Sequence, residues 1–236
     1  MSLTPNELTG IRDKPERVPG TIDSIWHAIG GQLRHPSGAI GALVGWLMAI
    51  VNNEPNRLAI EALALRPVDL VLELGFGPGR AVEKMAARVA RGRVEGVDQS
   101  ERMLRQATRR NRKAIAIGRV SLTRGPFNPL PWGEGSFDKI LLANVAYFLD
   151  AEGHDIAEAY RVLKPTGRMV IYVTARETMR NWPFSGPDSH RTFDARDLWI
   201  LLKQAGFDES AISVQELKLP LGISGLLAIA TKSERS

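Results

Sequence analysis

Three glycines at alternate positions, Gly75, Gly77 and Gly79, follow an apolar run that begins at Leu70 and contains one acid, Glu73. A bulky, nearly unbroken run of this kind is typical of a strand buried on both faces in a parallel sheet. Glycine lets the backbone adopt positive φ and leaves no Cβ between the main chain and a ligand. A helical pattern starts directly afterwards, and backbone amides at a helix N-terminus bind anions. The stretch therefore predicts a ligand-binding loop between a strand and a helix.

A second acid, Asp98, ends the next predicted short strand, residues 93–98, and lies 19 positions after Gly79. A carboxylate at the tip of the second parallel strand can accept hydrogen bonds from two vicinal ribose hydroxyls. Ser100 and Glu101 begin another helical pattern, so Asp98 could equally stabilise a helix N-terminus, and both roles could hold. The spacing predicts a ligand that contains a ribose.

The pattern Glu73-x-Gly75-x-Gly77-x-Gly79 resembles the first motif of the class I S-adenosylmethionine-dependent methyltransferases. The competing dinucleotide fingerprint, G-x-G-x-x-G, requires a third glycine where this chain has Arg80. Residues 135–145 resemble the fourth strand of the methyltransferase family through their Ser-Phe-Asp entry, and residues 161–170 resemble the helix, turn and fifth strand that follow. The resemblance is strong over residues 68–175 and extends to the flanks only in architecture.

The resemblance implies an α/β fold: a doubly wound, mostly parallel seven-stranded sheet with helices on both faces (a Rossmann-like methyltransferase fold) and an N-terminal helical lid. A chain of 236 residues is long enough for one such domain with an appendage. We therefore expect an N-terminal arm and helical lid at residues 1–66 and an S-adenosylmethionine-binding methyltransferase domain at residues 67–236. The longest apolar window, Gly38 to Val51, has 14 residues and is too short to span a bilayer. No transmembrane segment is expected, although peripheral contact with a membrane stays open.

S-Adenosyl-L-methionine is the cofactor that the resemblance implies, with S-adenosyl-L-homocysteine as product. Relatives usually carry an acid directly after the glycine at position 125, where it accepts a hydrogen bond from the adenine amino group, but this chain has Pro126. We expect the Phe127 amide and the Asn128 side chain to take over that contact. The cofactor-binding residues expected by resemblance are Glu73, Gly75, Gly77, Gly79, Asp98, Gln99, Met103, Gly125, Pro126, Phe127, Asn128 and Asn144.

Acceptor binding is expected from two segments, the helical region before the first strand and the long irregular connection at residues 175–193. In related methyltransferases the helical region folds over the cofactor, and the connection follows the fifth strand at the edge where open parallel sheets bind ligands. The candidate substrate-pocket residues are Trp26, Trp46, Tyr147, Trp182, Phe184 and His190. For the tryptophans of the helical region, burial in an ordinary core is the alternative.

No catalytic residue is assigned, because a methyl group on a sulfonium is electrophilic before the protein acts on it. A general base is needed only if the acceptor is protonated at working pH, and the candidates are Tyr147, His154 and His190. A lone histidine is more often solvated than catalytic. The four histidines are scattered and cysteine is absent, so no metal site is expected.

These features predict methyl transfer by in-line displacement from S-adenosylmethionine to an unidentified small-molecule or lipid-like acceptor. Cyclopropane formation on lipids, a nicotinamide-dependent oxidoreductase on a related Rossmann sheet, and a nucleic-acid-modifying methyltransferase are the alternatives. The net charge of +5 and pI near 9.7 suggest the last of these. The basic run from Arg109 to Lys113 also fits a solvated helix end, and the Asn/Asp-Pro-Pro-aromatic signature of DNA-amino methyltransferases is missing. We expect a cytoplasmic protein that does not bind nucleic acid; its oligomeric state is left open.

Overall fold

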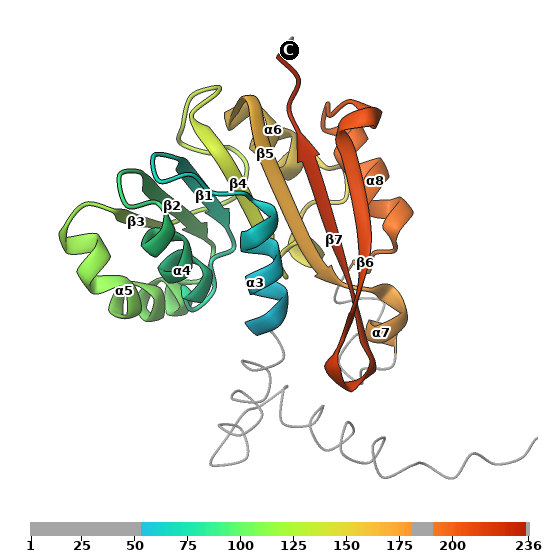
Figure 1. The fold of residues 1–236 in the computed structure, drawn as a ribbon, viewed down its shortest axis with the longest axis horizontal. Helices are drawn as coiled ribbons and strands as arrows, with labels where there is room; N and C mark the ends of the chain where they lie inside the picture. The colour runs from blue at the N-terminus through green and yellow to red at the C-terminus, as the bar shows by residue number, and fades with distance from the viewer. Residues whose placement is uncertain (1–52, 181–190, 235–236) are drawn as a thin grey trace, which may run out of the picture.

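The computed structural model describes residues 53–180 and 191–234, which form a sheet with helices packed on both faces (Figure 1). The arm and most of the expected lid lie outside the described residues. The last part of the lid region is present as helix α3 (Asn53–Ala62).

Seven strands form one sheet in the order β3-β2-β1-β4-β5-β7-β6. Strand β1 pairs in parallel with both β2 and β4, and β7 runs antiparallel to both β5 and β6. This arrangement confirms the predicted doubly wound, mostly parallel fold. The strands are β1 (Leu70–Leu74), β2 (Arg93–Asp98), β3 (Val120–Arg124), β4 (Phe137–Ala143), β5 (Leu163–Thr174), β6 (Ile212–Leu219) and β7 (Ile223–Thr231).

Helices cover the two faces of the sheet as separate groups, as Figure 1 shows. The helices after α3 are α4 (Arg80–Arg88), α5 (Glu101–Ala116), α6 (His154–Val162), α7 (Arg176–Arg180) and α8 (Ala195–Gln204), with short 3-10 turns η1 (Ala146–Phe148), η2 (Glu209–Ala211) and η3 (Pro220–Gly222). Because successive strand residues point to opposite faces, Val71 packs with α3, α4 and α5, whereas Leu72 packs with α6 and α8. The central strands are therefore buried on both sides, which explains their nearly continuous apolar sequence.

Helix α3 belongs to the core of the sheet domain. The Ala59, Ile60 and Leu63 side chains are at most 1% exposed, and Arg168 Nη1 donates a 3.0 Å hydrogen bond to the Ala62 carbonyl. The helix ends at Ala62. Residues assigned to the lid in the sequence analysis thus contribute to the same core as the strands.

The carboxyl ends of β1, β2 and β4 meet at the point where the chain changes direction in the sheet. From β1 the chain continues through α4 to β2 on one side, whereas β4 lies on the other side of β1. In open parallel sheets this divergence leaves a crevice that binds ligands. Within the described residues, no helix has the length and apolar character needed to cross a membrane.

Candidate functional site

A cavity of about 280 Å³ opens at this edge of the sheet. Seven of the predicted cofactor residues line it: Gly75, Gly77, Asp98, Gln99, Met103, Phe127 and Asn144. Three further lining residues, Ser100, Val145 and Phe148, were not predicted to bind the cofactor. Ser100 follows Gln99, and Val145 and Phe148 lie one and four residues after Asn144. Their closeness in sequence to two predicted residues is the signal that could have identified them.

The glycine loop has the backbone conformation that its sequence predicts. Gly75, Gly77 and Gly79 all have positive φ, at 71°, 50° and 76°. A Cβ added to Gly75 would lie 2.2 Å from Val145 Cγ2, whereas one added to Gly77 would meet no atom within 4 Å. Gly77 therefore borders open space on the cavity side, where a ligand can approach the main chain.

Gly79 lies between two helices and is not among the residues that line the cavity. It is buried, caps the N-terminus of α4, and does not line the cavity. An added Cβ would lie 2.7 Å from both Ala107 Cβ and Asn111 Nδ2 of α5. Gly79 thus allows α4 and α5 to pack closely, and its expected contact with the cofactor stays a prediction.

Asp98 connects the glycine loop to the start of α5. Its Oδ2 accepts a 2.8 Å hydrogen bond from the Gly77 amide, and its Oδ1 accepts one of 2.8 Å from the Ser100 amide. The carboxylate is 8% exposed and lines the cavity. Its position fits the expected role at the helix N-terminus. Because each carboxylate oxygen can accept two hydrogen bonds, acceptor capacity also remains for a ligand.

Glu73 lies beneath the cavity rather than in its lining. The side chain is 2% exposed, and Oε2 has no hydrogen-bond partner among the described residues. Burial, together with the nearby Asp98 charge, raises the pKa of Glu73 well above its ordinary value, although a hydrogen bond from the Val82 backbone opposes the shift. Glu73 is therefore buried beside the cavity residue Asp98 with a raised pKa, and its expected contact with the cofactor stays a prediction.

Of the residues expected to contact the adenine after β3, only one lines the cavity. Phe127 is 3% exposed and lines the cavity, but Gly125, Pro126 and Asn128 do not. Phe127 packs in the core, whereas the residues on either side of it, Pro126 and Asn128, are exposed. The structure thus does not support the expectation that the Asn128 side chain replaces the missing acid.

Tyr147 is engaged in a hydrogen-bonded link between two strand ends. Its hydroxyl accepts a hydrogen bond from the Thr174 amide and donates one of 3.2 Å to Asn144 Oδ1. Burial raises the pKa of Tyr147 to about 12. The phenol therefore remains a donor at neutral pH, which argues against its candidate role as a general base. Instead it orients Asn144, which lies at the end of β4 with a φ of 56° and lines the cavity.

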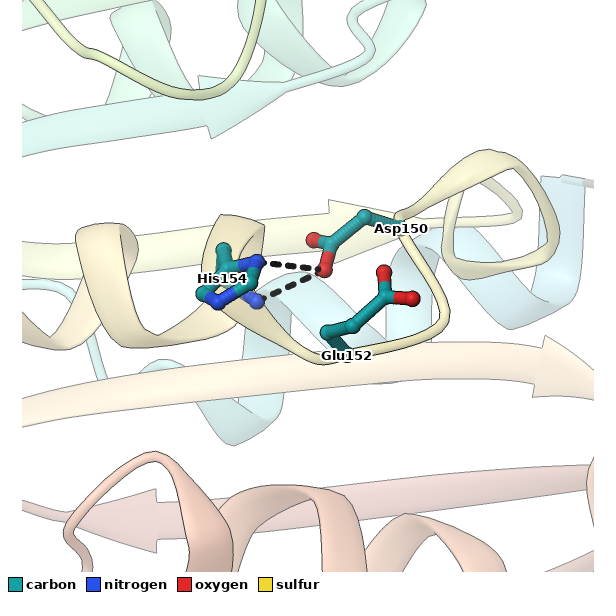
Figure 2. Close-up of side chains that lie close together, drawn as sticks. All are labelled: Asp150, Glu152 and His154. Carbon is teal, nitrogen blue, oxygen red and sulfur yellow. Dashed lines mark hydrogen bonds and ion pairs between the residues drawn. The ribbon is translucent and has the colours of Figure 1, made fainter.

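His154 lies at the N-terminus of α6 and does not line the cavity. Figure 2 shows its imidazole beside Asp150 and Glu152; candidate ligand atoms of the three residues lie within 4.8 Å of one another. The scattered positions of the histidines gave no indication of this grouping, because two of its three members are carboxylates. Asp150 also accepts hydrogen bonds from the amides of His154 and Asp155, at 2.8 and 2.7 Å, so the cluster stabilises the start of α6. These bonds lower the pKa of Asp150, although its partial burial acts in the opposite direction.

Five candidate residues, Trp26, Trp46, Trp182, Phe184 and His190, lie outside the described residues. Their roles remain predictions.

Comparison with known proteins extends the resemblance found in the motifs. A family model described as "Methyltransferase domain" matches residues 71–167, which include the glycine loop and β4. The uncharacterized methyltransferase YdaC of Bacillus subtilis is 29% identical over 181 residues, covering 77% of this chain and 94% of YdaC. The ubiquinone/menaquinone biosynthesis C-methyltransferase UbiE of Hydrogenovibrio crunogenus is 31% identical over 71% of this chain, which spans 62% of that protein.

The fold is also found among solved structures. A SAM-dependent methyltransferase from Aquifex aeolicus superimposes with a TM-score of 0.60 at 20% sequence identity. The superposition covers 76% of this chain and 90% of the Aquifex chain. The fold, the glycine loop and the sequence matches all agree. The chain belongs to the class I S-adenosylmethionine-dependent methyltransferases, enzymes whose cofactor is S-adenosylmethionine.

Proposed function

We propose that this chain transfers the methyl group of S-adenosylmethionine to a small-molecule or lipid-like acceptor by in-line displacement. The observation that carries this proposal is the cavity at the carboxyl ends of β1, β2 and β4. It combines open space at Gly77 with a buried carboxylate, Asp98. Both features fit a nucleoside ligand.

In this proposal the cavity residues have distinct roles. Asp98 accepts hydrogen bonds from the ribose hydroxyls, while its bonds to the Gly77 and Ser100 amides keep the carboxylate in one orientation. Phe127 and Met103 provide apolar contact for the adenine. Asn144, oriented by Tyr147, lies toward the methionine end of the cofactor.

When bound, S-adenosylmethionine supplies a methyl group that its positive sulfur makes electrophilic. The contribution of the protein is to hold an acceptor in line and exclude water, which can supply much of the rate enhancement. In the described lining, Asp98 is the one charged side chain, and two backbone amides already bind it. The lining therefore favours an acceptor that reacts without a histidine or tyrosine base from these residues.

The apolar character of the cavity mouth supports a lipid-like or aromatic acceptor. Phe148 lines the cavity with 59% of its surface exposed, and Val145 lies three residues earlier. UbiE, a relative, is named for ubiquinone and menaquinone biosynthesis, in keeping with an apolar acceptor. A nucleic acid would instead require basic side chains at the mouth, and the described lining contains none.

The direct test is methyl transfer from S-adenosylmethionine that carries a labelled methyl group. The full chain is incubated with a lipid extract or with total RNA and DNA, and the label is measured after solvent partition. We expect label in the lipid or small-molecule fraction with the natural chain and a large loss with Asp98→Ala. Exposed Glu101→Gln, at the same helix start, is the matched control and should retain activity. Label found mainly in nucleic acid would contradict the proposed acceptor class.

A further inference from the structure

The groove between α4 and α5 is a second hollow of the molecule, and it shares no lining residue with the cofactor cavity. Its volume is about 950 Å³. Short apolar side chains, among them Pro78, Ala86 and Ala114, line part of it, and Glu83 is the one acid in the described lining. Its basic lining residues are Arg109, Arg110, Arg112, Lys113 and Arg119.

This region concentrates the positive charge of the protein. Residues 101–119 contain seven basic residues and one acid, a net charge of +6, whereas the whole chain carries +5. The rest of the chain is therefore slightly negative, at −1. Arg109, Arg112 and Lys113 are exposed and form no ion pair with another described residue. Like charges at such helical spacings repel one another, so an anion bound between them would be stabilising.

A buried amide at the same groove provides an independent indication of a ligand. Asn111 lines the groove and is 3% exposed. Its Nδ2 donates hydrogen bonds to the carbonyls of Gly79 and Ala107, at 3.1 and 2.9 Å, whereas Oδ1 has no partner among the described residues. A buried acceptor without a donor is costly. Oδ1 has almost no accessible surface, so a ligand hydroxyl or amino group would satisfy it once the side chains that cover it shift.

We propose that the α4–α5 groove binds a small phosphate-bearing molecule that also carries a hydrogen-bond donor. Guanidinium groups match phosphate oxygens in a bidentate geometry, and the hollow has the size of a small-molecule pocket. No aromatic side chain in the described lining offers a base-stacking surface, and Glu83 would repel a continuous phosphate backbone. The site is separate from methyl transfer and does not depend on the acceptor proposed above.

The groove is connected to the cofactor loop through α5. Arg110 Nε donates a 3.0 Å hydrogen bond to the Pro78 carbonyl, and Asn111 Nδ2 donates one of 3.1 Å to the carbonyl of the following residue, Gly79. A phosphate that engages Arg110 competes with its bond to Pro78 and with its 3.4 Å contact to Glu83. Occupation of the groove should therefore change the affinity for S-adenosylhomocysteine, and linkage makes the effect reciprocal.

Titration calorimetry with inorganic pyrophosphate tests the site. The full chain is first saturated with S-adenosylhomocysteine, so that the cofactor cavity is filled, and the salt concentration is held near physiological. The groove variant is Arg109→Gln/Arg112→Gln/Lys113→Gln. The control, Arg102→Gln/Arg105→Gln/Arg196→Gln, removes the same charge from exposed positions outside the groove.

We expect pyrophosphate to bind the natural chain and the control similarly, and to bind the groove variant at least about tenfold more weakly. Circular dichroism confirms that each variant is folded. Absence of binding, or equal weakening in both variants, would overturn the site. Stronger binding of a single-stranded RNA or of phosphatidylglycerol vesicles at equal phosphate concentration, lost in the groove variant, would overturn the small-molecule assignment.

The coupling has a separate readout. The dissociation constant of S-adenosylhomocysteine is measured with and without saturating pyrophosphate, and we expect a change of about fivefold or more. An unchanged constant would overturn the coupling, and neither measurement depends on methyl transfer.

Discussion

At the scale of single residues, the three loop glycines share a positive φ but differ in what surrounds them. Gly75 packs against Val145, Gly77 borders open space at the cavity, and Gly79 packs against α5. The same substitution should therefore affect stability at some of these positions and ligand affinity at another.

Gly75→Ala and Gly77→Ala separate the two effects. Both substitutions introduce about 1–2 kcal/mol of backbone strain at positive φ. Gly75→Ala adds a steric clash with Val145, which we expect to cost a further ~1–3 kcal/mol in the free energy of unfolding. Gly77→Ala adds no clash, but its methyl group enters the cavity and should weaken S-adenosylhomocysteine binding. Urea unfolding measures the stability of both variants, and calorimetry measures their affinity for S-adenosylhomocysteine. Equal losses of stability would contradict the clash expected at Gly75.

Glu73 makes stability depend on pH through its raised pKa. Burial, then the Asp98 charge, raises the pKa of Glu73 in the folded protein above that in the unfolded chain. The folded state thus retains a proton that the unfolded state loses. The contribution of Glu73 to stability is complete below the unfolded pKa and is lost as pH rises through the folded pKa.

Glu73→Gln keeps the side-chain shape but cannot ionise. We expect the free energy of unfolding of the natural chain to fall relative to the Gln variant as pH rises from about 4.5 toward 8. Urea unfolding at several pH values measures the difference. A difference that is constant across this range would show that the pKa of Glu73 is not raised in the fold.

At the scale of elements, η1 joins the ends of β4 and β5 through one phenol. Tyr147 accepts a hydrogen bond from the Thr174 amide, at the end of β5, and donates to Asn144 after β4. This link orients Asn144, which lines the cavity. The pKa of Tyr147, about 12, keeps the phenol protonated at neutral pH. Tyr147 should therefore cause no break in pH–rate profiles near neutrality.

Tyr147→Phe removes this link without removing the ring. The buried Thr174 amide would lose its partner, at a cost of ~1–3 kcal/mol in unfolding free energy. S-Adenosylhomocysteine affinity should also fall, because Asn144 loses its orientation. Tyr160→Phe is the control, since the Tyr160 hydroxyl makes no hydrogen bond within the described residues, and it should leave affinity unchanged. Equal affinities for both variants would exclude the positioning role.

At the scale of the whole molecule, one sheet separates two apolar cores and presents the cofactor cavity at its edge. Strands β1, β2 and β4 all contribute to that cavity, so a bound ligand should stabilise the fold as a unit. A ligand at about 100 times its dissociation constant adds ~2.7 kcal/mol.

Thermal unfolding with S-adenosylhomocysteine or NADH measures this stabilisation. For a domain of this size we expect S-adenosylhomocysteine at that excess to raise Tm by roughly 5–10 °C. NADH should have little effect, and Asp98→Ala should abolish most of the S-adenosylhomocysteine shift. Stabilisation by NADH alone would contradict the assignment of the cavity to S-adenosylmethionine.

The elements were predictable where a local pattern decides them. The strand at Leu70–Leu74, the positive φ of the three glycines and the strand ending at Asp98 all follow from short-range sequence features. The sequence could not predict contacts that join distant segments. The burial of Glu73 with its raised pKa and the packing of Gly79 against α5 both depend on segments that local sequence does not specify.

The sequence by itself determined the class of fold and the methyl donor, because glycine spacing and apolar periodicity act within a few residues of chain. Only the tertiary structure decided which residues reach the cavity. It placed Gly77 beside open space and Gly79 beneath a helix, and it paired Tyr147 with Asn144 and Thr174. It also brought five basic side chains to one groove between α4 and α5. The physical reason is that burial, hydrogen bonding and charge density depend on distances across the fold, which the order of residues along the chain does not specify.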